Sequence, residues 1–351
     1  MLRQILDDDV HHTGRKTAGI YAFLITGNIG AWLWALIEFG DRPLLLAAAF
    51  LAYGLGLRHA FDADHIAAID NVTRKLMQER RRPLAVGLFF SLGHSTIVVG
   101  LVVAIALTTT ALQDRFDTLK AIGGTIGTSI SALFLFAIAA ANMVVLAQVY
   151  RAFQTARRDG VLAEDEIDLL LAKRGFLGRL LRPAFAVITR SWHMYPLGML
   201  FGLGFDTATE VGLLAISAAQ AAQSTSIASI LVFPALFTAG MSLMDTTDSV
   251  LMVRAYGWAF LKPIRKLYYN MTITFVSVMT ALVVGGIEAL GLIGDKLGLQ
   301  GPFWTFVGLR DGNFWFLGYG IVALFVGSWL VSTLLYRARG YDRLRVGVAR
   351  G

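Results

Sequence analysis

The stretch LLLAAAFLAYGLGLRHAFDADHI, residues 44–66, decides the fold class and locates the candidate site. It opens with an apolar run that suits a lipid bilayer and then places five ionisable residues within eight positions: Arg58, His59, Asp62, Asp64 and His65. A charged side chain at the centre of a bilayer costs about 3 kcal/mol or more. Such groups are kept in a membrane segment where they have a function or a buried partner.

The composition is that of an integral membrane protein. Of 351 residues, 56% are hydrophobic and 16% are charged, and the mean hydropathy is +0.62. A transmembrane helix needs roughly 20 apolar residues. Segments of this kind lie near 17–38, 44–66, 84–108, 125–150, 195–220, 228–253, 268–294 and 313–336. We therefore predict an all-α membrane protein with eight transmembrane helices.

The basic residues follow the membrane topology. With both termini in the cytoplasm, the cytoplasmic segments carry 25 Lys and Arg and the opposite loops carry 5. This positive-inside bias favours an even number of spans and explains the basic balance of the chain, so nucleic acid is not an expected partner. The expected location is the cytoplasmic (inner) membrane, with the lipid bilayer as the surroundings. The charged N-terminus shows no cleavable signal peptide.

The chain is predicted to form a single transmembrane domain, and its oligomeric state stays open. Residues 17–150 hold spans one to four, 151–194 form a cytoplasmic loop with surface helices, 195–336 hold spans five to eight, and 337–351 form a basic tail. The chain has no cysteine, which excludes disulfides and thiolate metal ligands.

Two halves of the chain resemble each other. Phe61-Asp62 aligns with Phe205-Asp206 at an offset of 144 residues, and Gly93 aligns with Gly240 at an offset of 147. Span two then corresponds to span five and span three to span six. An odd offset in spans makes the two units, spans 2–4 and 5–7, cross the membrane in opposite directions. Inverted repeats of this kind are typical of secondary transporters.

Glycines accompany the acidic residues in both halves, at positions 54, 56, 202 and 204. They would permit local unwinding, which frees backbone carbonyls for a cation. They would equally permit close packing of helices. The sequence leaves both interpretations open.

The ionisable cluster fits a divalent metal. On an ideal helix His59, Asp62 and His65 occupy one stripe about 120° wide. Asp64 points elsewhere, and it would reach such a site through unwinding or by orienting an imidazole. The alternative is structural: Arg58 would neutralise Asp62 as a buried ion pair. In that case Asp64 and His65 would lie at the wet cytoplasmic end of the span.

Other spans supply further candidates. His94 follows Gly93 in span three and is a predicted ligand, as are Asp206 in span five and Asp245 in span six. Weaker candidates carry hydroxyl, amide or carboxyl groups in the same spans: Ser95, Asn142, Thr207, Thr209, Glu210 and Asp248. Glu38 and Glu288 lie at span ends and are interpreted as interfacial.

Imidazole with carboxylate and without thiolate suits Ni²⁺ or Co²⁺ best, and it allows Zn²⁺ and Mn²⁺. The cargo would then be a divalent metal ion. No GxxxxGK[ST] motif is present, so this chain holds no ATPase motif. We expect no cofactor and no catalytic residues, and we expect that the chain is not an enzyme.

The motifs RHAFDADHI, LGHSTIVV, LGFDTATEV and GMSLMDTTDS, in this order across spans two to six, resemble the signature segments of the nickel/cobalt transporter (NiCoT) family. The span-two signature of that family, His, four residues, then Asp-His, matches His59, Asp64 and His65. The resemblance implies eight spans, uptake of Ni²⁺ or Co²⁺, and an essential role for those three residues. It does not choose between nickel and cobalt.

Three other function classes remain as alternatives. An organic-cation or amino-acid transporter would use the intramembrane acids as a proton relay. An intramembrane metalloenzyme is disfavoured, because the chain has no HExxH motif and few histidines in its spans. A metal-sensing receptor would need an output domain, for which the loop at 151–194 is short.

Overall fold

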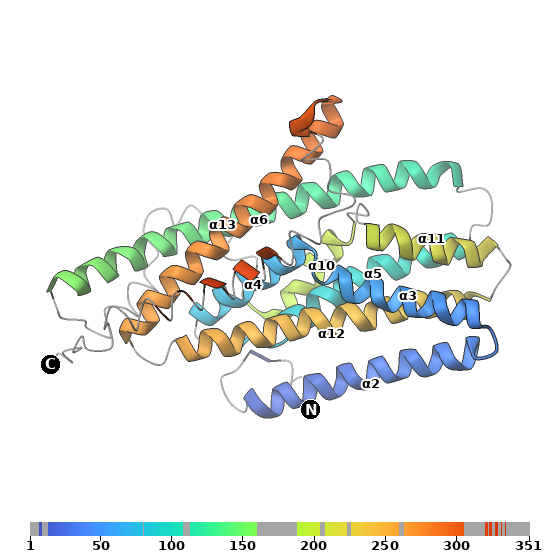
Figure 1. The fold of residues 1–351 in the computed structure, drawn as a ribbon, viewed down its shortest axis with the longest axis horizontal. Helices are drawn as coiled ribbons and strands as arrows, with labels where there is room; N and C mark the ends of the chain where they lie inside the picture. The colour runs from blue at the N-terminus through green and yellow to red at the C-terminus, as the bar shows by residue number, and fades with distance from the viewer. Residues whose placement is uncertain are drawn as a thin grey trace.

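The computed structural model describes residues 7–8, 13–79, 81–107, 113–159, 188–203, 208–222, 226–259, 263–304 and scattered positions from 320 to 334. All regular structure within these ranges is helical. The helices are α2 (Thr13–Phe39), α3 (Pro43–His59), α4 (Ala63–Gln78), α5 (Val86–Leu107), α6 (Gln113–Asp159), η1 (Ser191–His193), α10 (Met194–Phe201), α11 (Ala208–Ala222), α12 (Ile227–Ala259) and α13 (Pro263–Leu297). Figure 1 shows them as one elongated bundle, in which α6 and α13 pack against each other.

Five of the described helices are long and apolar enough to cross a membrane: α2, α5, α6, α12 and α13. The bent pair α3–α4 would make a sixth span. The predicted all-α membrane class is confirmed. The fifth predicted span corresponds to α10 and α11. Residues 204–207 between them lie outside the described residues. The eighth, at 313–336, lies largely outside it as well, so the count of eight stays a prediction.

The second predicted span is broken, and the expectation of one continuous helical stripe through His59 and His65 is wrong. α3 begins with Pro43, whose fixed φ suits a first helical turn, and it ends at His59. Asp62 then takes an extended conformation, φ −65° and ψ 143°, and α4 starts at Ala63 with its axis bent by 50°. The break turns the side chains after it in a new direction.

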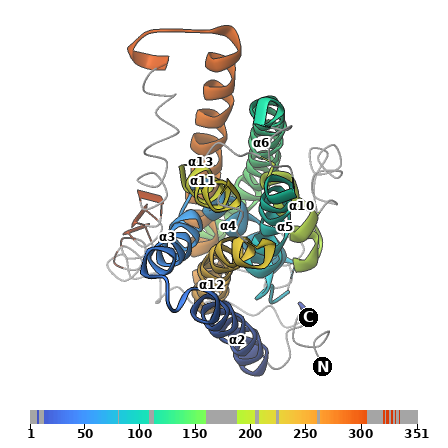
Figure 2. The same ribbon diagram turned by 90° about the vertical axis from the view of Figure 1, so that its right-hand side faces the viewer.

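α4 lies in the middle of the bundle, between α5, α6, α12 and α13 (Figure 2). Fourteen of its sixteen residues are buried, including several polar ones. Buried polar groups need hydrogen-bond partners, and neighbouring helices provide them. Ser277 of α13 donates to Asp70 at 2.6 Å, and Asn142 of α6 donates to Asn71 at 2.8 Å. The centre of the bundle is therefore α4, a helix with several polar residues, and more apolar helices surround it.

Glycines bring α3 and α12 into backbone contact. A Cβ atom on Gly56 would lie 2.1 Å from the carbonyl oxygen of Phe237, and one on Gly240 would lie 2.9 Å from that of Tyr53. Phe237 lies three residues before Gly240, and Tyr53 lies three residues before Gly56. Each glycine thus faces the carbonyl of the residue three positions before the other glycine. For Gly56, the close-packing interpretation of the sequence is confirmed.

The same arrangement joins α5 and α10. A Cβ atom on Gly198 would lie 2.1 Å from the carbonyl oxygen of Phe90, and one on Gly93 would lie 2.0 Å from that of Tyr195. Both carbonyls again lie three residues before the partner glycine. In Figure 2 the two crossings, α3 with α12 and α5 with α10, are neighbouring pairs around α4.

The segment before α2 ties two distant parts of the chain together. The carboxylate of Asp8 accepts hydrogen bonds from the backbone N–H and the hydroxyl of Ser191, and its carbonyl accepts one from the N–H of Arg82. Burial raises the pKa of Asp8 above its ordinary value, against the opposing effect of the Ser191 hydrogen bonds. Of the predicted loop at 151–194, the first part continues α6 to Asp159, and residues 160–187 lie outside the described residues.

Candidate functional site

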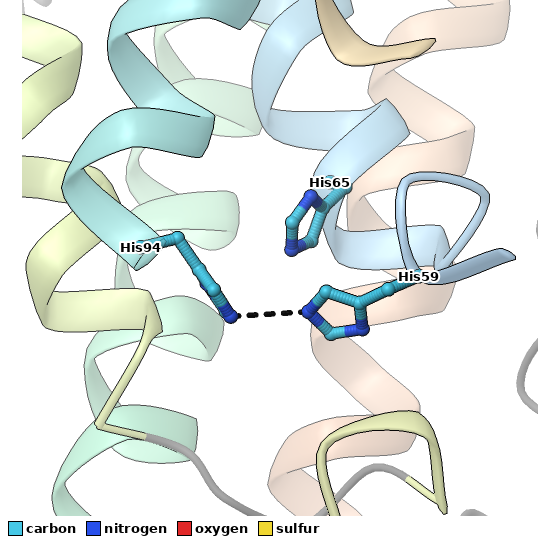
Figure 3. A group of neighbouring side chains, drawn as sticks. All are labelled: His59, His65 and His94. Atoms are coloured by element: carbon cyan, nitrogen blue, oxygen red, sulfur yellow. Dashed lines mark hydrogen bonds between the residues drawn. The ribbon is translucent and has the colours of Figure 1, made fainter. Parts of the chain in front are cut away.

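Three imidazoles converge beside the break between α3 and α4. His59 ends α3, His65 lies in α4, and His94 comes from α5 (Figure 3). One nitrogen of each ring lies within 4.8 Å of a nitrogen of the other two. Their side chains are at most 3% exposed. The break in span two brings His59 and His65 together, with ring centroids 4.5 Å apart.

Two of the imidazoles share a carboxylate from α11. The Nε2 atoms of His59 and His94 are 3.1 Å apart. Glu210 places Oε1 at 2.8 Å from Nε2 of His94 and at 3.9 Å from Nε2 of His59. Glu210 is 1% exposed. The three atoms form a small triangle of two nitrogens and one oxygen that a metal ion can bridge.

Two further carboxylates orient the rings. Oδ2 of Asp62 lies 2.7 Å from Nδ1 of His59, and Oδ2 of Asp245 lies 3.3 Å from Nδ1 of His65. An ionised carboxylate accepts hydrogen bonds and cannot donate them, so these contacts place the ring proton on Nδ1. The lone pair is then on Nε2, where a metal can bind it.

The remaining nitrogen of His65 has no protein partner in the described part of the chain. Nε2 of His65 is buried and unpaired, as are Nδ1 of His94 and Oδ1 of Asp245. An unpaired buried polar atom costs about 1–3 kcal/mol. A site that keeps such atoms beside three imidazoles is suited to a ligand that pairs with them. The carboxylates around it would offset the charge of a divalent cation.

The structural alternative for the span-two cluster does not hold for His65, which is 0% exposed and so does not lie at a wet end. Asp62 has His59 as its hydrogen-bond partner, and the charge of Arg58 acts on it from further away. Asp64 stays outside the triangle. Its charge reaches His59 and His65, and its Oδ1 atom has no partner among the described residues.

The other candidates divide into three groups. Thr209 joins the site, with its hydroxyl 3.0 Å from Nδ1 of His59. Asn142 donates a hydrogen bond to Asn71 of α4, and the buried Ser95 Oγ and Asp248 Oδ2 atoms have no hydrogen-bond partner in the described ranges. Asp206 and Thr207 lie outside the described residues.

Sequence reasoning missed two features. It ranked Glu210 below Asp206, although Glu210 contacts His94 directly. The signal in the sequence was that Glu210 belongs to the same motif, LGFDTATEV, as Asp206. It also interpreted Glu288 as interfacial from its place near a span end and did not predict that its side chain packs inside the protein, where it is only 5% exposed.

Comparison with known proteins shows the family. The family model for NicO, high-affinity nickel-transport protein, matches residues 45–335. A "High-affinity nickel transport protein" of Cupriavidus necator is 61% identical over 336 residues, which cover 95% of this chain and 96% of the relative. "Nickel transporter NixA" of Staphylococcus aureus is 50% identical over 307 residues, 88% of this chain and 89% of the relative.

A third relative is named for another metal. "Cobalt transport protein NhlF" of Rhodococcus rhodochrous is 42% identical over 342 residues, 92% of this chain and 95% of the relative. No solved structure matches the chain significantly. The matched proteins are transport proteins, in agreement with the expectation that this chain is not an enzyme. The chain belongs to the high-affinity nickel-transport protein (NicO) family, which confirms the resemblance to nickel/cobalt transporters drawn from its motifs.

Proposed function

We propose that this protein is a secondary transporter that imports Ni²⁺, Co²⁺ or both across the cytoplasmic membrane, with its two termini in the cytoplasm. The observation that carries the proposal is the buried cluster of His59, His65 and His94 beside Glu210. Relatives named for nickel and for cobalt support the choice of cargo. The alternatives of an organic-cation transporter and a metalloenzyme are not favoured by these relatives.

The spacing of the site supports metal ligation by Nε2 of His59 and His94 and by Oε1 of Glu210. Metal–nitrogen bonds are about 2.1 Å long, so two ligands at a right angle are about 3.0 Å apart and two tetrahedral ligands about 3.4 Å apart. Two of the separations, 3.1 Å and 2.8 Å, are close to the right-angle value, and the third, 3.9 Å between Nε2 of His59 and Oε1 of Glu210, is wider than either value. Nickel with nitrogen-rich ligands favours square or octahedral coordination.

His65 completes the ligand set from α4. Asp245 holds the proton of its ring on Nδ1, and the free Nε2 atom is buried near the other imidazoles. Three neutral nitrogens and one carboxylate leave part of the double charge of the cargo unneutralised. The nearby carboxylates of Asp62, Asp64 and Asp245 would offset the rest.

Alternating access would come from the inverted repeat. The offset between Gly93 and Gly240 makes α5 correspond to α12. Gly56 of α3 packs against α12 as Gly198 of α10 packs against α5, so α3 corresponds to α10. The first helix of one half, α3, then packs against α12 of the other half, and the first helix of that half, α10, packs against α5. Two matched crossings around a central site give the two halves equivalent contact surfaces for rocking against each other.

The membrane potential would supply the driving force. Moving a double positive charge through the full field releases roughly 4.6 kcal/mol per 100 mV. No ATP and no bound cofactor enter this mechanism. Protons compete with metal for imidazole nitrogen, so uptake should fall as the medium is acidified.

The test is uptake of ⁶³Ni²⁺ into proteoliposomes under an imposed inside-negative potential, for wild type, His94→Ala and the matched control His193→Ala. His193 lies in η1 and is not part of the three-histidine cluster. We expect uptake by wild type and the control and none by His94→Ala. Failure of folded wild type to take up nickel or cobalt would overturn the proposal.

A further inference from the structure

A second group of acidic side chains lies where α4, α6 and α13 meet. Glu288 of α13 is 5% exposed, and its Oε1 atom accepts a hydrogen bond of 3.0 Å from the hydroxyl of Ser131 on α6. Its other oxygen, Oε2, is buried and has no partner in the described part of the chain. The buried position of this carboxyl group is unexplained by the three-histidine site, which it does not contact.

Asp64 brings a second carboxyl group to this place. Its Oδ1 atom is also buried and unpaired among the described residues. The charges of Asp64 and Glu288 act on each other. Within the described ranges neither group has a lysine or arginine partner. Two acidic groups with unpaired, buried oxygens are costly unless a cation or a proton accompanies them.

Packing places the three helix segments that carry these groups around one shared core. Leu135 and Val284 lie one helical turn from Ser131 and Glu288, and both belong to a buried cluster that includes Ala63. Asp64 is the next residue after Ala63. The hydroxyl and the two carboxyl groups therefore border the same packed core, and each comes from a different helix.

We propose that Glu288 and Asp64, with the hydroxyl of Ser131, form a second cation position. This inference rests on the proposed function, because the cation is taken to be the divalent cargo. The donors are all oxygen, which suits a hard or partly hydrated divalent ion, whereas the imidazoles suit a dehydrated transition metal. The second position therefore binds the cargo more weakly and with more of its water.

Asp64 connects the two positions. Its charge acts on Glu288 and also on His59, His65 and Asp245. A cation at the oxygen position thus lies within electrostatic range of the imidazole position. Transfer between them exchanges water and carboxylate oxygen for imidazole nitrogen without carrying a bare ion through an apolar region.

The experiment measures equilibrium binding of Mn²⁺ to the purified full chain in detergent, with EPR detection of free ion. Mn²⁺ is the probe because it accepts oxygen ligands readily. We expect two classes of site in wild type. Glu288→Gln should weaken one class by at least about tenfold and leave Ni²⁺ binding at the imidazoles within about threefold. His94→Ala should weaken the other class.

Glu38→Gln is the matched control, because Glu38 also accepts a hydrogen bond from a serine hydroxyl, that of Ser229. It should leave both classes unchanged. Glu288→Asp, which keeps the charge but shortens the side chain, gives a second test if Glu288→Gln does not fold, and it should weaken the same class as Glu288→Gln. Unchanged Mn²⁺ binding in a folded Glu288 variant, or a single class of site in wild type, would overturn the second position. If wild type shows both classes of Mn²⁺ site but takes up no nickel, the result would instead count against the proposed function.

Discussion

Oε1 of Glu210 lies 2.8 Å from Nε2 of His94, and this contact joins α11 to α5 inside the bundle. The same oxygen is 3.9 Å from Nε2 of His59 on α3. Three helices thus direct ligand atoms at one point, where a single metal ion would replace direct contacts between them. Binding of the cargo would strengthen the connection between the two halves of the chain.

Removing the charge of Glu210 should weaken metal binding. Glu210→Gln keeps the volume of the side chain but gives up an anionic ligand, so we expect affinity for Ni²⁺ to fall by at least about tenfold. Isothermal titration calorimetry on purified protein measures this. Glu38→Gln serves as the control, and an affinity for Glu210→Gln equal to that of wild type would exclude Glu210 as a ligand.

Asp245 should matter through His65. Asp245→Asn replaces a pure acceptor with a group that can also donate, so Nδ1 of His65 is no longer forced to carry the proton. Loss of such an orienting carboxylate typically costs 10- to 100-fold in metal affinity. We expect a Ni²⁺ affinity lowered within that range, measured by equilibrium dialysis. The exposed Asp295 gives the control Asp295→Asn, and equal affinities of the two variants would contradict the orienting role.

The glycine crossings can be tested by stability. In Gly93→Ala the new Cβ would meet the Tyr195 carbonyl oxygen at 2.0 Å, and in Gly100→Ala on the same helix it would meet nothing within 4 Å. Overpacking of this kind typically costs about 1–3 kcal/mol. Thermal unfolding in detergent should show a lower Tm for Gly93→Ala than for wild type. The Tm of Gly100→Ala should equal that of wild type. A Gly93→Ala protein as stable as wild type would mean that α5 and α10 are less closely packed.

Asp8 predicts a dependence of stability on pH. Burial raises its pKa in the folded protein, so the folded state favours the protonated carboxyl group. Its stabilising contribution is then present at acid pH and is lost as pH rises through the raised pKa. The Asn of Asp8→Asn stays neutral, so wild type should lose stability relative to this variant between acid and neutral pH. Tm values of both proteins across that range measure the difference, and a constant difference would contradict the raised pKa.

The sequence predicted the class of fold because long apolar segments need no tertiary information to be recognised. It located His59, His65 and His94 because ionisable groups in such segments are few. It did not predict the break at Asp62, since local periodicity continues through it and the bend depends on packing around α4. The burial of Glu288 was missed for a similar reason. A residue near the end of a span is interfacial by its position alone, and only the neighbouring α6 shows that it is enclosed.

The measurement that tests the central claim most directly is X-ray absorption at the nickel edge of the purified protein loaded with one equivalent of Ni²⁺. The proposed site predicts imidazole scattering that fits three histidine ligands, with the remaining ligands oxygen, and two histidine ligands in His94→Ala. A nickel environment of oxygen alone, or one that His94→Ala leaves unchanged, would contradict the assignment of the cargo to the three histidines.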